Sequence, residues 1–299
     1  MTCRQFRLGR MKFFKRIFAS FVISLVLIFY GLPSASANQS GDIVWKQYIL
    51  PPVKFVGGTF AGKGYAQRIV GDIAKHLPKY NHVLQYGTFA NIFSDLQSRP
   101  GLCALCLKKT KEREKFLIYS KPVYVFIEAT LAVRSQSTAL VDGFVDKNNQ
   151  VDLDTLWRKS DLAFGFYPGR RYNPVINDFI SSYRDYTPDR FWGHDSPLML
   201  LDGRRVAAAF LHPQESRFGI LENSYALSLK FYGIKGSSPL ALAYVACAQS
   251  KWGKRVIRQI NRILKTTNIH EKGIGYYSEW LTDDTRRWYS SRAKKLLHP

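Results

Sequence analysis

Apolar runs and amphipathic stretches alternate along most of the chain. Continuous apolar runs bounded by turn residues, each of which predicts a buried strand, occur at 102–107, 130–133, 162–167 and 206–211. Between them, apolar residues recur at helical spacing, as in the series Tyr65, Ile69, Val70, Ile73 and Leu77. Strands that alternate with helices indicate an α/β fold with mostly parallel sheets.

The last third of the chain is expected to be helical. One helical face is marked by Trp252, Val256, Ile260, Ile263 and Leu264. With 299 residues the chain is long enough for two domain-sized units, and its sequence contains no visible internal repeat.

The N-terminal segment has the composition of a secretory signal peptide. Six basic residues precede an apolar run at 18–30, which is followed by Pro33 and by Ala35-Ser36-Ala37. The run is shorter than the roughly 20 apolar residues of a membrane span. We therefore expect cleavage after Ala37 and a mature periplasmic protein that starts at Asn38. A retained membrane anchor is the alternative.

The chain is strongly basic, with 44 Lys and Arg against 22 Asp and Glu and a net charge of +22. Loss of 1–37 removes six basic residues and no acidic ones, so the mature protein stays basic. The cations are scattered along the sequence rather than massed in arms, and an exported protein rarely meets nucleic acid. The charge therefore favours envelope surfaces or anionic solutes as partners, and no nucleic acid.

Three cysteines remain after position 37, namely Cys103, Cys106 and Cys247. Cys103 and Cys106 have the spacing of redox or zinc motifs, but they lie inside the apolar run 102–107. In a strand, residues three apart point to opposite faces with Cα atoms about 10 Å apart. We therefore expect buried thiols that form neither a mutual disulfide nor a zinc site, unless one of them pairs with Cys247.

No motif of an enzyme or metal site occurs in the sequence. Residues 57–64 almost match the phosphate-binding loop G-x-x-x-x-G-K-[ST], but Gly64 lacks the hydroxyl that holds Mg²⁺. We interpret this loop as a turn whose backbone N–H groups enter a helix and face a bound solute. There is no G-x-S-x-G elbow and no H-E-x-x-H pair. The histidines are expected to be exposed or structural: His76, His82, His194, His212, His270 and His298.

These observations leave binding as the leading function, with no catalytic residues, no metal and no cofactor. The segment 96–134 resembles a particular family of binding proteins. Its Thr110-Lys-Glu-Arg113 turn, followed by Phe116-Leu-Ile-Tyr-Ser-Lys-Pro122, resembles the T-x-x-R … F-S-x-P-Y signature of extracellular solute-binding proteins of family 3. This is the amino-acid type of periplasmic binding protein. The resemblance is specific between 45 and 134 and looser as far as Gly203-Arg204.

The resemblance implies a type II periplasmic binding protein fold, in which two α/β lobes are joined by two hinge strands. Lobe 1 is expected to comprise 38–133 plus 232–299, and lobe 2 to comprise 134–231. A solute trapped between the lobes of a monomer is presented to an inner-membrane ABC permease. A sensory module without a transporter is one alternative, and an exported enzyme on the same fold is another.

Arg113 is the residue on which this functional prediction mainly depends. An arginine at the start of a helix presents a planar fork of donors to a carboxylate. In the family this arginine holds the α-carboxylate of the ligand and the threonine three residues earlier assists, which carries over to Arg113 and Thr110. The alternative is an exposed ion pair between Arg113 and Glu112 or Glu114.

A second anion-binding turn is implied at 168–172, where Arg170 and Arg171 follow Gly169. A solvated basic turn is the alternative. In the family, aromatic walls cover the ligand. The candidates for these walls are Tyr48, Phe60, Tyr167 and Tyr172.

The chain also departs from the family pattern. The run 206–211 contains no acid for a ligand ammonium, so either Glu215 takes that role or the ligand lacks a simple α-ammonium. Lys108 and Cys106 stand where the family prefers small hydroxyl residues. A cation at Lys108 favours a more anionic ligand.

The prediction for the N-terminus is that the exported protein starts at Asn38. Signal peptidase recognises the small residues Ala35 and Ala37 after the apolar run. Intact mass spectrometry of exported protein checks this, and a mass that retains residues 18–30 would establish an anchored protein instead.

Overall fold

The computed structural model describes residues 41–168, 170–184, 188–193 and 196–297. The expected signal peptide at 1–37, its cleavage site after Ala37, Gly169, His194 and His298 lie outside the described residues. No helix within the described ranges is long and apolar enough to cross a membrane.

The first sheet has five strands in the described part of the chain, ordered β2 (Asn81–Tyr86), β1 (Asp42–Gln47), β3 (Leu102–Leu107), β11 (Leu240–Ala248) and β4 (Leu117–Ile127). β1 runs parallel to β2 and to β3, whereas β11 runs antiparallel to β3 and to β4. The strand expected at 102–107 is present with these bounds and is buried on both faces, as its continuous apolar run predicts.

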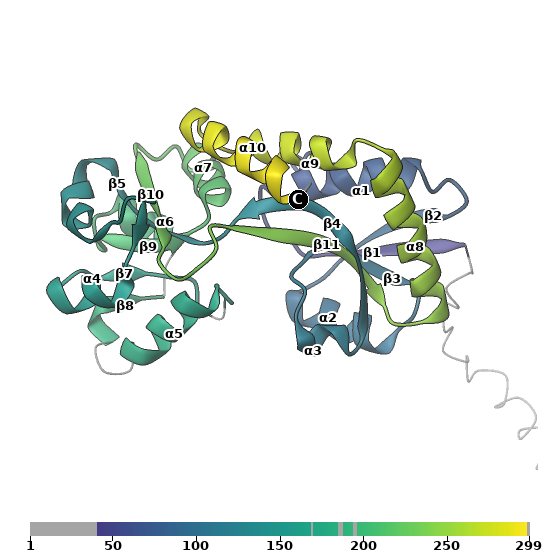
Figure 1. Ribbon diagram of the computed structural model, residues 1–299, viewed down its shortest axis with the longest axis horizontal. Coiled ribbons are helices and arrows are strands. Elements are labelled where there is room, and N and C mark those ends of the chain that lie inside the picture. The colour runs from purple at the N-terminus through teal and green to yellow at the C-terminus, as the bar shows by residue number, and fades with distance from the viewer. Residues whose placement is uncertain (1–40, 169, 185–187, 194–195, 298–299) are drawn as a thin grey trace, which may run out of the picture. The chain divides into compact units, whose positions relative to one another are not determined.

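Helices cover both faces of this sheet (Figure 1). One face packs against α1 (Tyr65–Lys75), α8 (Lys251–Thr266), α9 (Ile269–Ser278) and α10 (Asp283–Leu297). The opposite face packs against α2 (Phe89–Ser98), and the four-residue helix α3 (Lys111–Glu114) follows β3. The expected helical character of the C-terminal third is confirmed from Lys251 onward, whereas the part of this third before Lys251 also contains strands, among them β11.

The second sheet has six strands in the described residues, ordered β6 (Gln150–Val151), β10 (Leu229–Ile234), β5 (Thr130–Arg134), β9 (Ala208–Leu211), β7 (Phe164–Gly165) and β8 (Phe191–Trp192). Like the first sheet, it mixes parallel and antiparallel pairs. The helices of this part are α4 (Leu153–Lys159), α5 (Pro174–Tyr183), α6 (Pro197–Asp202) and α7 (Pro213–Glu222), with short 3₁₀ turns at Ser135–Leu140, Asp142–Phe144 and Pro188–Arg190.

Each sheet has its own core. Ile43, Trp45 and Ile69 belong to the main cluster on the first sheet, whereas Phe164 and Phe210 belong to a cluster on the second. The two α/β lobes of the expected fold class are therefore present.

The chain passes from the first sheet to the second between β4 and β5, and returns between β10 and β11. The boundaries expected at 133/134 and 231/232 fall within β5 and β10, both of which pair inside the second sheet. We propose boundaries at the connections instead, near 128 and near 238.

The near-match to a phosphate-binding loop has a structural cause at its last position. Gly64 is the residue before α1, and a Cβ built there would lie 2.4 Å from the Val53 carbonyl oxygen. The Gln67 side chain closes this turn, because its amide accepts from the Phe55 N–H and donates to the Phe55 carbonyl. Only glycine fits the close approach at position 64, and any hydroxyl residue is excluded by packing.

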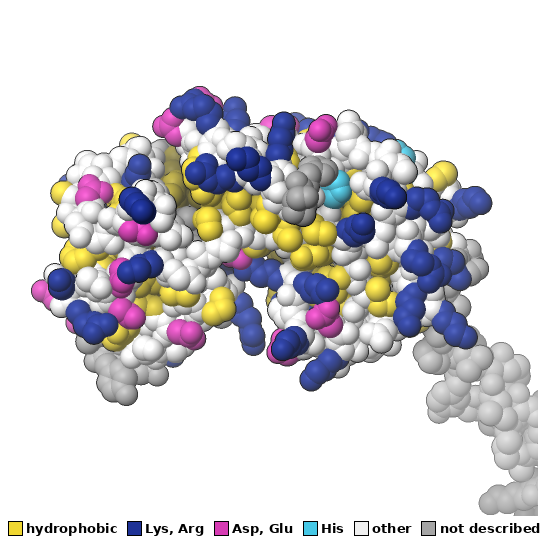
Figure 2. All heavy atoms as spheres, viewed as in Figure 1, with side chains coloured by type: hydrophobic (Ala, Val, Ile, Leu, Met, Phe, Trp, Pro, Cys, Tyr) yellow, Lys and Arg dark blue, Asp and Glu magenta, His cyan; other side chains and the backbone are white. Residues whose placement is uncertain are grey.

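The basic residues are spread over the surface. Figure 2 shows Lys and Arg side chains over much of the visible face, with fewer Asp and Glu between them. Helix α8 combines an apolar face in the core with exposed cations on its outer side, which are Lys251, Lys254, Arg255, Arg258, Arg262 and Lys265.

The cysteines partly correct the sequence-based expectation. Cys103 and Cys106 do not pair with each other, as expected, but Cys103 is not a free thiol because it forms a disulfide with Cys247. The two residues face each other on the antiparallel strands β3 and β11. Cys106 is the free thiol of the described residues, and its backbone has a φ of 73° at the end of β3. The disulfide thus ties the strand that leads into the Thr110–Arg113 turn to its neighbour.

Replacing both Cys103 and Cys247 with Ala is expected to lower the free energy of unfolding by about 2 to 5 kcal/mol, because the long loop between them is no longer closed in the unfolded chain. Urea unfolding of protein that starts at Asn38 measures this. Thiol titration of the wild type in denaturant should find one thiol, that of Cys106. A titre of three thiols, or equal stability of the two proteins, would show that the disulfide does not form.

Candidate functional site

The candidate site lies at the carboxyl ends of β1 and β3. These strands are parallel neighbours, so the residues that follow them emerge at the same edge of the sheet. Tyr48 follows β1, and the segment from Lys108 to Arg113 follows β3. The parallel pairing of β1 with β3 therefore brings Tyr48 and the Thr110–Arg113 turn to one place.

Thr110 fixes the start of the turn. It is the N-cap of α3, and its hydroxyl accepts a hydrogen bond from the Arg113 backbone N–H at 3.4 Å. This is the capping arrangement that threonine favours at helix starts. Thr110 thus positions Arg113 through the backbone.

Arg113 is half-buried and its guanidinium is held from two sides. One Nη donates to the Lys108 carbonyl at 3.0 Å, and the guanidinium carbon lies 4.4 Å from the centroid of the Phe93 ring and 5.8 Å from that of Phe89. Burial lowers the pKa of Arg113 from its ordinary value, yet that value is so high that the side chain stays charged.

Arg113 makes no ion pair with any carboxylate of the described residues. The alternative of a surface ion pair with Glu114 does not hold, since Glu114 binds Lys109 at 2.9 Å. Glu112 is exposed, and no salt bridge joins it to Arg113. A half-buried guanidinium with a prearranged orientation and no counter-charge is suited to an incoming anion.

Lys108 does not present its charge as the sequence suggested. Its ammonium donates to both carboxylate oxygens of Glu128, at 2.8 and 2.9 Å. The backbone carbonyl of Lys108 accepts from Arg113 and, at 3.2 Å, from the Tyr119 hydroxyl. Lys108 therefore contributes a carbonyl that orients Arg113, while its cation is neutralised.

Arg170 and Glu215 neutralise each other in the same way. Two guanidinium nitrogens of Arg170 donate to the two Glu215 oxygens at 2.6 and 2.7 Å, which is a bidentate pair. Burial raises the pKa of the Glu215 carboxyl, but Arg170 and His212 lower it by more, so its pKa lies below the usual range. The sequence assigned these two residues to separate ligand groups, whereas the structure joins them. Arg171 is exposed.

Tyr167 and Tyr172, the aromatic candidates beside the second turn, use their hydroxyls for contacts within the protein. The Tyr172 hydroxyl accepts from the Tyr167 N–H at 2.8 Å, and burial raises the pKa of Tyr172 to about 12. The Tyr167 hydroxyl lies 3.3 Å from the Ser196 hydroxyl. Phe60 belongs to a separate aromatic cluster, with ring centroids 5.3 to 6.0 Å from those of Phe55, Phe218 and Trp280.

Tyr48 is the predicted aromatic residue that lies beside the residues of the first turn. Its ring packs edge-on against Phe89, with centroids 5.4 Å apart. Burial raises the pKa of its hydroxyl, Cys106 and Glu215 raise it further, and Arg170 and Arg113 oppose this rise. Charges from the first turn and from the Arg170–Glu215 pair therefore act on the same hydroxyl.

Lys54 is a residue of this cluster that the sequence analysis missed. It is fully buried, its ammonium lies 4.5 Å from the centroid of the Tyr48 ring, and it donates to the Leu105 carbonyl at 3.4 Å. No carboxylate of the described residues lies within ion-pair distance, and burial lowers its pKa. The available signal was one lysine inside the apolar segment 50–56, but its burial depends on what covers it.

Cys106 completes the buried polar cluster beside Lys54. The Tyr124 hydroxyl donates to the Cys106 sulfur at 2.9 Å. Burial raises the pKa of this thiol, although Lys54 opposes the rise. Cys106 is therefore a protonated thiol at neutral pH.

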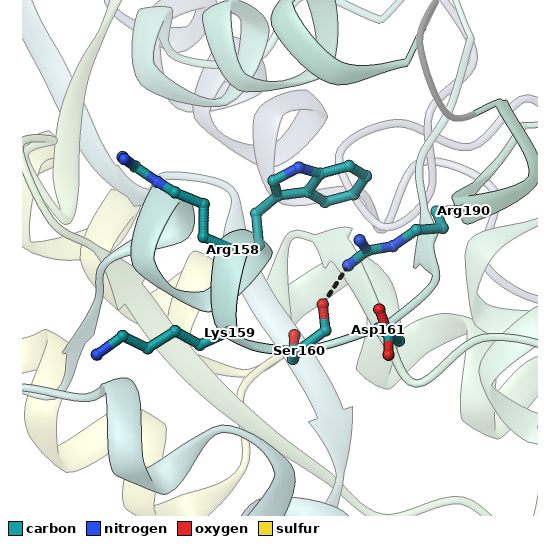
Figure 3. A pocket seen from close by; sticks show the side chains of 6 residues that line it. Arg158, Lys159, Ser160, Asp161 and Arg190 are labelled. Carbon is teal, nitrogen blue, oxygen red and sulfur yellow. Dashed lines mark hydrogen bonds between the residues drawn. The ribbon is translucent and has the colours of Figure 1, made fainter.

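Two cavities of the described residues are lined by neither Arg113, Tyr48 nor Lys54. One, of about 470 Å³, is lined by Trp157, Arg158, Lys159, Ser160, Asp161 and Arg190 (Figure 3). Arg190 already donates to the Ser160 carbonyl at 2.7 Å and stacks on Trp157 at 3.6 Å, so its charge is engaged. The other, of about 330 Å³, is bordered by Lys108, Lys109 and residues of β11.

No family model matches the chain, and no curated protein matches its sequence. Solved structures match its fold with 13 to 18% identity. An arginine transport periplasmic binding protein from Legionella pneumophila is 17% identical, with a TM-score of 0.53 over 81% of this chain and 99% of that one. The VFT2 domain of BvgS from Bordetella pertussis, solved as a double mutant, is 14% identical, with a TM-score of 0.55 over 82% of this chain and 94% of that one.

The ligand-binding core of the receptor GluR0 in complex with L-glutamate is also similar, with 14% identity and a TM-score of 0.55 over 81% of this chain and 98% of that one. A histidine kinase sensor domain matches as well. The fold is that of type II periplasmic binding proteins, and the resemblance inferred from the Thr110–Arg113 segment is confirmed at this level. The chain therefore shares its architecture with transport receptors and with sensor domains.

Replacing Lys54 with Met is expected to stabilise the protein without solute by about 1 to 3 kcal/mol at pH 7, because an uncompensated ammonium leaves the interior. The folded pKa of Lys54 lies below its ordinary 10.5. Between the two values unfolding takes up a proton at Lys54, so wild-type stability rises with pH and the advantage of the variant shrinks.

Lys46 offers a matched control, since it is also buried but paired with Asp95. Lys46→Met should destabilise the protein by at least about 1 kcal/mol, because it leaves Asp95 without this partner. Urea unfolding of the wild type and both variants from pH 7 to 10 measures these effects. Equal losses in both variants would show that Lys54 is compensated after all.

Proposed function

We propose that the protein is a solute-binding receptor that holds the carboxylate of a small solute at Arg113. The single observation that carries this proposal is the unpaired, half-buried guanidinium of Arg113, which Thr110, Lys108 and Phe93 hold in place. A planar fork held in this way binds a carboxylate through two parallel hydrogen bonds.

The surroundings of Arg113 support the same proposal. Tyr48, Phe89 and Phe93 supply aromatic surface beside the guanidinium. Arg170 and Glu215, which belong to lobe 2, act electrostatically on Tyr48, which belongs to lobe 1. We infer that the solute lies between these two groups of residues and that closure of the units around it forms the state that a partner recognises.

We further propose that the mature protein acts in the periplasm as a monomer, that an inner-membrane ABC permease receives the solute, and that no catalytic step occurs. The likeness to an arginine transport binding protein supports a transport role. The likeness to a histidine kinase sensor domain and to BvgS supports the alternative of a sensory receptor. Solute binding is common to both.

Arg113→Ala is expected to weaken solute binding by roughly 2 to 5 kcal/mol, because a desolvated carboxylate loses its partner. Arg113→Lys should also bind poorly, since a point charge cannot replace the fork. A thermal-shift screen of amino acids, short peptides and organic acids on refolded, solute-free protein supplies the solute, and calorimetric titration measures the affinities.

Lys109→Ala is the matched control, because it removes the same charge from the same turn while Lys109 pairs only with Glu114 at the surface. It should change the affinity by less than about 1 kcal/mol. If Arg113→Ala binds the solute as the wild type does, Arg113 is not in the site and the proposed function loses its support.

A further inference from the structure

We propose that the solute is an organic acid with an aromatic or otherwise apolar body and no ammonium group. This inference rests on the proposed function, since it concerns the solute held at Arg113. It follows from the way in which the described residues around Tyr48 distribute their charges.

The first step concerns Glu215, the acid that the sequence offered for a ligand ammonium. Both of its oxygens accept hydrogen bonds from Arg170, at 2.6 and 2.7 Å. An ammonium that bound Glu215 would have to displace a bidentate guanidinium, which is the stronger partner of a carboxylate. Glu215 is therefore occupied by the protein's own cation.

The remaining acids near the first turn are paired with cations of the protein or exposed to solvent. Both oxygens of Glu128 accept from Lys108, at 2.8 and 2.9 Å. Glu114 pairs with Lys109, and Glu112 is exposed on α3. Within the described residues, no buried carboxylate beside Arg113 or Tyr48 is left for a ligand cation, and the unpaired Glu112 is exposed to solvent.

The second step concerns the cations, which are in excess. Arg113 has no anionic partner among the described residues, and neither has Lys54 beneath the Tyr48 ring. An ammonium placed beside Tyr48 would meet two positive side chains in a partly desolvated environment, where like charges repel more strongly than in water. A carboxylate without an ammonium matches this imbalance.

The third step concerns the shape and polarity of the surface beside Arg113. Phe89 is 48% exposed although it is a large apolar residue, and Ile49, which follows Tyr48 in the sequence, is 62% exposed. Phe89 packs against Tyr48 and lies under the Arg113 guanidinium together with Phe93. Exposed aromatic surface next to a free cation fits an apolar body attached to the carboxylate.

The experiment compares two acids that differ only in the ammonium group. Solute-free protein that starts at Asn38 is titrated calorimetrically with 3-phenylpropionate and with L-phenylalanine. A second pair, succinate and L-aspartate, has the same difference without the apolar body. We expect 3-phenylpropionate to bind at least tenfold more tightly than L-phenylalanine and more tightly than succinate.

A variant tests the cause of this preference. Arg170→Leu leaves the Glu215 carboxylate without its partner, so the preference for 3-phenylpropionate over L-phenylalanine should shrink by tenfold or more. Lys235→Leu breaks the Lys235–Asp152 pair of 3.1 Å in the same α/β unit and should leave the preference unchanged. Glu215→Gln should keep or enlarge the preference for 3-phenylpropionate, because Glu215 binds no ammonium in our account and its loss leaves Arg170 as a further unpaired cation.

The outcomes separate this inference from the proposed function. Tighter binding of L-phenylalanine than of 3-phenylpropionate by the wild type overturns the inference while a carboxylate receptor stands. Tighter binding of succinate than of 3-phenylpropionate overturns the inference that the solute has an apolar body. Failure of every acid and amino acid to bind contradicts the proposed function and removes the inference with it. If Arg170→Leu and Lys235→Leu change the preference for 3-phenylpropionate over L-phenylalanine equally, the Arg170–Glu215 pair does not cause the preference.

Discussion

The requirement that a charge removed from water be compensated organises this molecule. Lys46 is paired with Asp95, Lys108 with Glu128 and Arg170 with Glu215. Arg113 and Lys54 have no such partner among the described residues, although one is half-buried and the other fully buried. Leaving a buried charge unpaired is costly, so two such cations beside one tyrosine support the proposal that a solute anion binds there.

The fold makes this arrangement possible through one strand. β3 is buried on both faces, carries Leu105 and Cys106 to Lys54, and ends at the turn that holds Arg113. The disulfide to β11 and the parallel pairing with β1 fix the position of β3. Tyr48 is brought beside the turn because β1 and β3 end at the same edge. The site is thus built from the centre of the first sheet outward.

The sequence predicted the elements that are determined by residues close to one another in the chain. The apolar run 102–107 predicted β3, and the Thr110–Arg113 segment predicted a turn at which a helix starts. Features that depend on contacts between residues far apart in the sequence could not be predicted in this way. The Cys103–Cys247 bond needs the antiparallel pairing of β3 with β11, the Arg170–Glu215 pair joins residues 45 apart, and the burial of Lys54 depends on Tyr48. The expected strand 162–167 pairs only at Phe164–Gly165, because the extent of a strand is set by its neighbours.

The most direct test of the account is a crystal structure of the protein in complex with the tightest-binding acid. The account predicts both carboxylate oxygens within about 2.7 to 2.9 Å of Arg113 guanidinium nitrogens, with the Arg170–Glu215 pair intact. A carboxylate bound elsewhere, with Arg113 still unpaired, would contradict the central claim. So would a Glu215 that has left Arg170 to bind a cationic group of the ligand.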